Sequence, residues 1–266
     1  MDYFEAIILG IVQGLTEFLP ISSSGHLEIS KAILGNDFSN KESLLFTIVL
    51  HFATALSTIV FFRKDISQII LGLFDREDKE SSKFSISIMI SMIPAVLIGL
   101  FFEETINSFF NGNLILVAVM LYVTSILLYL SDIIKLDSKE ITFKNSFLIG
   151  LAQAIAILPG ISRSGATIAT AVVIGIDREK AARFSFIMVI PLIFGSMAKS
   201  IIDNGIAFEN FDFFSVALGF VSAFITGLLA CKWMISLVKK SKLYYFSIYC
   251  CIVGSIIIYY SLKNGI

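Results

Sequence analysis

Charged side chains are scarce in this chain. Only 15% of its 266 residues are Asp, Glu, Lys or Arg, against about 25% in an average soluble protein. Hydrophobic residues make up 56%, and the mean hydropathy is +0.88. The net charge of −1 does not provide the basic surface that nucleic-acid binding requires. The composition therefore predicts an integral membrane protein and excludes a nucleic-acid partner.

Cysteine is also rare. Cys231, Cys250 and Cys251 fall in or beside apolar segments, and two of them are adjacent in sequence. This spacing matches neither a disulfide framework nor a zinc site. We expect all three to be small apolar core residues, because free cysteine is among the most buried residue types.

Long apolar segments recur along the whole chain, each close to or above the roughly 17–25 residues that a helix needs to cross a bilayer. They are Leu44–Phe62, Phe84–Phe102, Leu114–Leu130, Phe184–Ile202, Phe213–Leu237 and Leu243–Leu262. The predicted fold is an all-α integral membrane protein with about six spanning helices. Residues 1–266 form a single polytopic membrane domain.

Two polar segments, Gln13–His26 and Gln153–Thr167, are versions of one sequence set 140 positions apart. The matching pairs are Gly10 and Gly150, Gln13 and Gln153, Ile21 and Ile161, Ser22 and Ser162, Ser24 and Ser164, and Gly25 and Gly165. They indicate internal repeats at approximately 1–130 and 141–266.

Lysine and arginine are concentrated in segments 63–83, 131–144 and 238–242, whereas 103–113 and 203–212 contain none. Short loops rich in Lys and Arg stay cytoplasmic, so the first three segments are predicted to lie inside and both termini outside.

With these segments alternating between inside and outside, each polar segment must begin and end on the same side of the membrane. Each is therefore predicted to be a helix pair that enters the membrane and returns, and the two pairs enter from opposite sides. Their tips, Pro20–Gly25 and Gly160–Gly165, would meet at mid-membrane. The prediction is an inverted-topology repeat with two re-entrant helix pairs. The alternative is that Pro20 and Pro159 merely kink ordinary spanning helices.

The two copies differ in the chemistry they carry. Glu17, Ser23 and His26 belong to the first copy, while Arg163 and Thr167 belong to the second. A charged residue at mid-membrane costs at least about 2.5–3.5 kcal/mol, so Arg163 needs an anionic partner or ligand. Glu17 should face Arg163, a metal ion or water. This division suggests one site between the copies.

Each tip places serine and glycine at the start of a short helix. Such a start offers unpaired N–H groups and partial positive charge, which suits phosphate, and Arg163 can grip phosphate oxygens bidentately. The alternative is that Ser22 and Ser162 are only N-caps. The candidate substrate-binding residues are Gln13, Ser22, Ser24, Gly25, Ser162, Ser164, Gly165 and Thr167.

The candidate catalytic residues are Glu17, Ser23, His26 and Arg163. Ser23 and His26 are three positions apart at one helix start, close enough for a hydroxyl–imidazole contact that would activate the serine. The second histidine, His51, is interpreted as a helix-packing residue outside both tips, with a supporting role at the site as the alternative.

The segment Gln13–His26, together with Leu158–Thr167, resembles the bacitracin-resistance family of undecaprenyl-diphosphate phosphatases, and the resemblance covers essentially the whole chain. The family's first motif has Glu or Gln at the position of Gln13 and Glu at that of Glu17; this chain carries the neutral option. The resemblance implies hydrolysis of undecaprenyl diphosphate to the monophosphate carrier lipid of cell-wall synthesis, and with it bacitracin resistance. It also implies a divalent cation, Mg²⁺ or Ca²⁺, with Glu17 as a ligand, and a site open to the outer face of the bacterial cytoplasmic membrane.

Three hypotheses remain. In the first, Ser23, His26 or water attacks the terminal phosphorus, with His26 or Glu17 as general base. In the second, the same site serves a lipid flippase or transporter, which needs no nucleophile. The third, a structural membrane subunit, leaves Glu17 and Arg163 unexplained. A polyprenyl diphosphate and membrane lipids are the expected partners. A homo-oligomer is compatible with the sequence, which does not identify the oligomeric state.

Overall fold

The computed structural model describes residues 2–34, 40–74, 78–109, 113–134, 139–204, 212–240 and 242–264. Over these ranges the regular structure is helical, with one isolated parallel bridge between Lys139 and Ile176. The helices are α1 (Tyr3–Phe18), α2 (Ser23–Leu34), α3 (Asn40–Phe61), α4 (Arg63–Phe74), α5 (Lys79–Phe101), α6 (Glu103–Phe109), α7 (Leu114–Ile133), α8 (Phe143–Ile155), α9 (Arg163–Val173), α10 (Arg178–Asn204), α11 (Phe213–Lys239) and α12 (Tyr244–Asn264).

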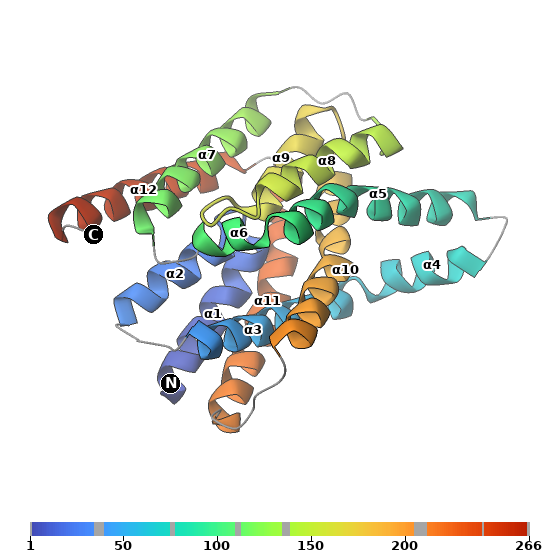
Figure 1. The fold of residues 1–266 in the computed structure, drawn as a ribbon. Helices are drawn as coiled ribbons and strands as arrows, with labels where there is room; N and C mark the ends of the chain where they lie inside the picture. Colours follow the sequence, from blue (N-terminus) through green and yellow to red (C-terminus); the bar gives the residue numbers. More distant parts are fainter. Residues whose placement is uncertain are drawn as a thin grey trace.

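Five of these helices, α5, α7, α10, α11 and α12, are long and apolar enough to cross a membrane. A sixth span is obtained if α3 and α4 are counted together, although the chain bends by 78° between them. Figure 1 shows α4 and the start of α5 extending away from the rest of the molecule. The predicted all-α fold with about six apolar spans is therefore confirmed.

Two connecting segments predicted as loops contain helices instead. The basic segment 63–83 forms α4 and the first turn of α5, and the segment 103–113 contains α6. Helix α4 forms because its sequence is amphipathic: Ile66 and Ile69 pack against the core, while Arg63 and Lys64 are exposed.

The two polar segments are broken helix pairs, as predicted from their prolines. Helix α1 ends just before Pro20, and α8 ends before Pro159, because proline lacks a backbone N–H and disfavours the helical conformation in the residue before it. The chain reverses through residues with positive φ: 71° at Ser22 and 97° at Gly160. Short helices α2 and α9 then begin at Ser23 and Arg163.

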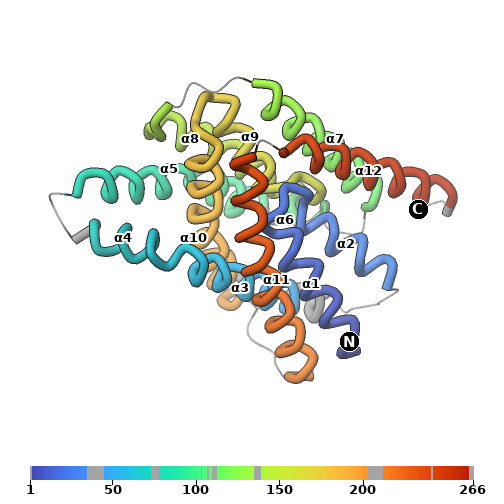
Figure 2. Tube along the Cα trace, turned by 180° about the vertical axis from the view of Figure 1, so that it is seen from behind, coloured from blue at the N-terminus to red at the C-terminus, as the bar shows by residue number. Residues whose placement is uncertain are grey.

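Matching helices of the two repeats pack in matching ways. Helix α1 lies along α11, and α8 lies along α5 (Figures 1 and 2). Gly10 faces the carbonyl of Gly219, and its counterpart Gly150 faces the carbonyl of Ser91, with no room for a Cβ atom at either glycine. These reciprocal contacts fit a duplicated frame. The orientation of the two halves in a membrane stays a prediction.

The three cysteines are free thiols. Cys231 and Cys250 are buried and Cys251 is exposed. Cys250 packs against the first tip, with its Sγ 3.8 Å from the Pro20 carbonyl oxygen. The expectation of buried core residues therefore fits two of the three.

Candidate active site

Glu17 is the residue on which the first tip converges. It lies in the last turn of α1 and is buried, with 8% of its surface exposed. Its Oε2 accepts a hydrogen bond from Gln13 Nε2 at 3.0 Å and another from Ser23 Oγ at 2.8 Å. Gln13 is one turn earlier on α1 and Ser23 opens α2, so the break between the two helices is what brings these side chains onto one carboxylate.

Arg163 reaches the same carboxylate from the second tip. It is the first residue of α9, and its Nη2 donates to Glu17 Oε1. Its Nη1 donates to the backbone carbonyl of Ser185 on α10 at 3.4 Å. The structure thus brings together the acid of one repeat and the cation of the other, as the division of charge between the copies suggested.

Both members of this ion pair are largely removed from solvent, with 7% of the Glu17 side chain and 16% of the Arg163 side chain exposed. Removing one partner from a buried pair typically destabilises a protein by about 3–5 kcal/mol, because the other charge is left uncompensated. Loss of either charge is therefore expected to destabilise the protein, because the remaining charge would be buried without a partner.

Ser22 and Ser162 cap the two short helices. Ser22 Oγ accepts from the Gly25 N–H at 3.2 Å, and Ser162 Oγ accepts from the Gly165 N–H at 3.1 Å. The alternative interpretation of these two serines as N-caps is therefore correct for this conformation. A role in substrate binding would be in addition to capping.

The two tips touch each other reciprocally. A Cβ atom on Gly25 would lie 3.3 Å from Gly160 Cα, and one on Gly165 would lie 3.2 Å from Pro20 Cβ. Ser164 Oγ donates to the Leu19 carbonyl at 3.3 Å, which ties the second tip to the first. Ser24 Oγ lies 3.4 Å from Ser22 Oγ. The glycines allow the two loops to meet without side chains between them.

The predicted contact between Ser23 and His26 does not form. His26 Nδ1 lies 2.8 Å from the Ser22 carbonyl, and Nε2 lies 2.9 Å from the hydroxyl of Tyr249 on α12. The two rings also stack, with centroids 5.6 Å apart. The imidazole turns away because a backbone carbonyl one turn earlier and a tyrosine from another helix occupy both of its nitrogens. The Tyr249 partner, 223 positions away, could not be found from local spacing.

His51 lies at the site, contrary to its interpretation as a residue outside both tips. Its Nε2 is 3.9 Å from Glu17 Oε2, and its Nδ1 is 2.8 Å from the Thr47 carbonyl. His51 lies on α3, which packs against α1. A histidine within an apolar span was the available signal, since polar side chains at such depth usually have a functional partner.

Sequence reasoning also missed two supporting residues. Thr124 on α7 accepts from the Ser162 N–H at 3.0 Å and donates to the Gly160 carbonyl at 3.1 Å, fixing the second tip. Ser185 on α10 lies 2.6 Å from the hydroxyl of Thr167, which also donates to the Arg163 carbonyl at 2.8 Å. Thr167 thereby supports the start of α9, and any contact with substrate stays a prediction.

The oxygen atoms around Glu17 could supply part, but not all, of the coordination of a divalent cation. No cluster of three or more His, Cys, Asp or Glu side chains occurs in the described parts of the chain, so there is no closed protein cage. Mg²⁺ usually needs only one or two carboxylates, with phosphate oxygens and water completing its shell. Glu17 supplies one carboxylate. Gln13 Oε1 beside it is buried and has no hydrogen-bond partner among the described residues.

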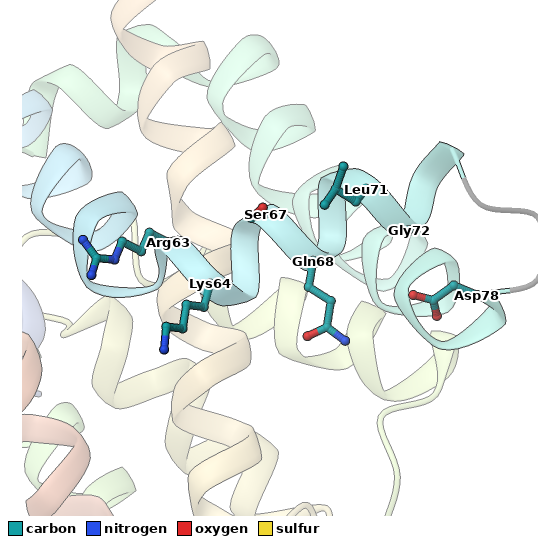
Figure 3. Close-up of a pocket in the computed structure, with 7 residues that line it drawn as sticks. All are labelled: Arg63, Lys64, Ser67, Gln68, Leu71, Gly72 and Asp78. Atoms are coloured by element: carbon teal, nitrogen blue, oxygen red, sulfur yellow. The ribbon is translucent and has the colours of Figure 1, made fainter.

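A separate surface pocket of about 620 Å³ lies beside α4. Figure 3 shows its lining residues, with Arg63, Lys64 and Gln68 on α4 and Asp78 just before α5. None of the candidate catalytic or substrate-binding residues lines this pocket. It is therefore not the site defined by Glu17 and Arg163.

The chain is similar to known proteins over nearly its whole length. The family described as Bacitracin resistance protein BacA matches residues 6–256. This chain belongs to that family. A relative named undecaprenyl-diphosphatase from Christiangramia forsetii is 58% identical over 254 residues, covering 96% of each chain. Relatives of the same name from Bacteroides fragilis and Methanobrevibacter smithii are 49% and 41% identical, and each alignment covers at least 97% of both chains. The family resemblance inferred from the two motifs is confirmed.

Proposed function

We infer that this protein hydrolyses undecaprenyl diphosphate to undecaprenyl phosphate and inorganic phosphate. Full-length similarity to proteins named undecaprenyl-diphosphatase supports this activity. The decisive feature of the site is Glu17, which binds Ser23 of its own repeat and Arg163 of the other. The Glu17 carboxylate, a proton acceptor, therefore contacts both the candidate nucleophile Ser23 and the phosphate-binding side chain of Arg163.

Binding of the diphosphate is assigned to the second tip and to the helix starts. The guanidinium of Arg163 presents a planar set of donors that matches phosphate oxygens. The N-termini of α2 and α9 add partial positive charge, which stabilises the extra negative charge of the transferring phosphoryl group. Arg163 remains held by Glu17 and the Ser185 carbonyl, so its position is set before substrate arrives.

The geometry favours Ser23 as the attacking group and Glu17 as its proton acceptor. Ser23 Oγ donates directly to Glu17 Oε2, whereas both nitrogens of His26 have other partners. In this scheme Ser23 Oγ forms a bond to the terminal phosphorus, its proton passes to Glu17, and undecaprenyl phosphate leaves. Water then attacks the phosphoserine and releases phosphate. Water activated by Glu17 could attack instead, with Ser23 positioning it.

A divalent cation, Mg²⁺ or Ca²⁺, completes this proposal, with Glu17 as a protein ligand. Such an ion offsets negative charge on the diphosphate and on the transferring group. Gln13 Oε1, which has no hydrogen-bond partner in the described parts of the chain, is a further oxygen at the same place. Because Gln13 is neutral, it neither accepts a proton nor adds charge.

The alternative of a flippase or transporter has no specific support at this site. A carrier needs an anion site but no nucleophile, whereas Ser23 is hydrogen-bonded to a carboxylate. We place the enzyme in the bacterial cytoplasmic membrane, with the site open to the outer face. There it would recycle the carrier lipid for cell-wall synthesis and confer bacitracin resistance.

The test is phosphate release from a long-chain polyprenyl diphosphate by purified protein in detergent. We expect turnover that excess EDTA suppresses and that added Mg²⁺ or Ca²⁺ restores. Absence of phosphate release with either ion present would contradict the hydrolase. Undiminished turnover after bound metal has been removed would contradict only the cation.

A further inference from the structure

His51 presents a defined nitrogen to the catalytic carboxylate. Its Nδ1 lies 2.8 Å from the carbonyl oxygen of Thr47, which can only accept a hydrogen bond. Nδ1 therefore carries the hydrogen, and in the neutral ring the Nε2 lone pair is free. That Nε2 lies 3.9 Å from Glu17 Oε2.

In the neutral ring, His51 Nε2 and Glu17 Oε2 are both acceptors, so neither can donate a hydrogen bond to the other. The separation of 3.9 Å is too long for a hydrogen bond. The same separation is compatible with a cation bonded to both atoms at about 2.1–2.4 Å. Gln13 donates to the same carboxylate oxygen through Nε2, and its Oε1, for which the described residues provide no donor, is a third acceptor close by.

We propose that His51 Nε2 and Glu17 Oε2 are the two protein ligands of a divalent cation, with phosphate oxygens of the substrate and water completing its coordination. This inference rests on the cation proposed above. Histidines that bind metal usually donate their other ring N–H to a carboxylate or a backbone carbonyl, which fixes the tautomer and the ring orientation. The bond from His51 to Thr47 has this form.

The two proposed ligands differ in exposure. The side chain of His51 is 29% exposed, whereas that of Glu17 is 7% exposed and is hydrogen-bonded by Arg163, Ser23 and Gln13. The imidazole is therefore the more accessible of the two.

A nitrogen ligand changes which ions the site prefers. Ca²⁺ favours shells made only of oxygen, whereas imidazole suits first-row transition ions. Mn²⁺ binds both oxygen and nitrogen ligands and has a strong EPR signal, so it is the probe we choose. We expect Mn²⁺ to bind more tightly than Ca²⁺ and to show a magnetic coupling to an imidazole nitrogen.

The chain contains only two histidines, which makes the assignment direct. Tag-free protein in detergent is titrated with Mn²⁺ alone, and the bound ion is measured by EPR, with pulsed experiments for ¹⁴N coupling. We expect the coupling in the wild type and in His26→Ala, and its loss in His51→Ala with at least about tenfold weaker binding. Glu17→Gln should weaken binding as well. His51→Gln, which keeps a polar side chain, controls for folding and should also lack the imidazole signal.

The outcomes separate this inference from the proposal of a cation. If wild-type protein binds no Mn²⁺, His51 and Glu17 do not form a cation site by themselves and this inference is wrong, while suppression of turnover by EDTA still decides the cation. If His51→Ala binds Mn²⁺ as tightly as wild type while Glu17→Gln does not, the cation remains and His51 is no ligand. Wild-type binding without any nitrogen coupling would mean that His51 contacts Glu17 only as an ion pair.

Discussion

Glu17 uses both of its carboxylate oxygens, and the two have different partners. Oε1 receives the guanidinium of Arg163, and Oε2 receives Ser23 and Gln13. One oxygen therefore holds the group that binds phosphate, while the other faces the candidate nucleophile. At the scale of single residues, phosphate binding by Arg163 and nucleophilic attack by Ser23 therefore involve different oxygens of Glu17, and each can be tested by one substitution.

Ser23→Ala should lower kcat by at least about 10²-fold while KM changes little, because it removes the proposed nucleophile and leaves Arg163 in place. The measurement is steady-state phosphate release. Ser24→Ala is the matched control, since Ser24 lies next in the chain and its hydroxyl contacts Ser22, not Glu17. Near-normal turnover of Ser23→Ala would leave water on Glu17 as the attacking group.

Arg163→Lys should reduce kcat/KM by about 10–100-fold, a loss of roughly 1.4–2.7 kcal/mol of transition-state stabilisation. Lysine keeps the charge but cannot contact Glu17, the Ser185 carbonyl and phosphate with one planar group. The thermal unfolding temperature of the variant checks that the lysine still compensates the buried charge of Glu17. If this variant has wild-type kinetics, the planar guanidinium of Arg163 is not needed for phosphate binding.

At the scale of elements, the two breaks in α1–α2 and α8–α9 create the site. Each break turns the chain so that a helix N-terminus, a capping serine and a glycine arrive at the same place. The second break depends most on backbone conformation, because Gly160 has φ 97° and packs against the Val117 carbonyl on α7.

Gly160→Ala should lower the free energy of unfolding by more than about 1 kcal/mol, since an alanine there is strained and its Cβ would overlap the Val117 carbonyl. Ser162→Ala, which removes the cap of α9 and the 3.3 Å contact with Ser164 Oγ, should lower it by about 1 kcal/mol. Chemical denaturation in detergent compares the two variants. A Gly160→Ala protein as stable as wild type would mean that the tip can rearrange.

At the scale of the whole molecule, the distribution of Lys and Arg predicts which face is cytoplasmic. The basic residues Arg63 and Lys64 begin α4, whereas α6 carries no Lys or Arg. Helix α4 should therefore lie inside and α6 outside, with the first tip entering from the outer side.

Cysteine labelling in intact cells tests this topology. In a background without native cysteines, an impermeant reagent should label Glu104→Cys on α6 and should not label Gln68→Cys on α4. Both positions are exposed in the structure, so they form a matched pair. Labelling of Gln68→Cys by the impermeant reagent would contradict the topology and the inverted repeat that depends on it.

The sequence by itself determined the membrane class, the number of apolar spans and the two motifs. Hydropathy and segment length are local properties, so an apolar run of spanning length specifies its helix whatever surrounds it. Pro20 and Pro159 predicted the two breaks for the same reason, although the residue with positive φ in the first break is Ser22 and not a glycine. The match between Ser22 and Ser162 also predicted, from repetition alone, that both helix starts would be built alike.

Only the tertiary structure decided which side chains meet. Ser23 and His26 are near in sequence, yet His26 binds Tyr249, 223 positions away, and Ser23 binds Glu17. His51 and Ser185 join the site from α3 and α10. These contacts depend on how separate helices pack across the molecule, and spacing along one helix carries no information about the neighbours that its polar side chains will find.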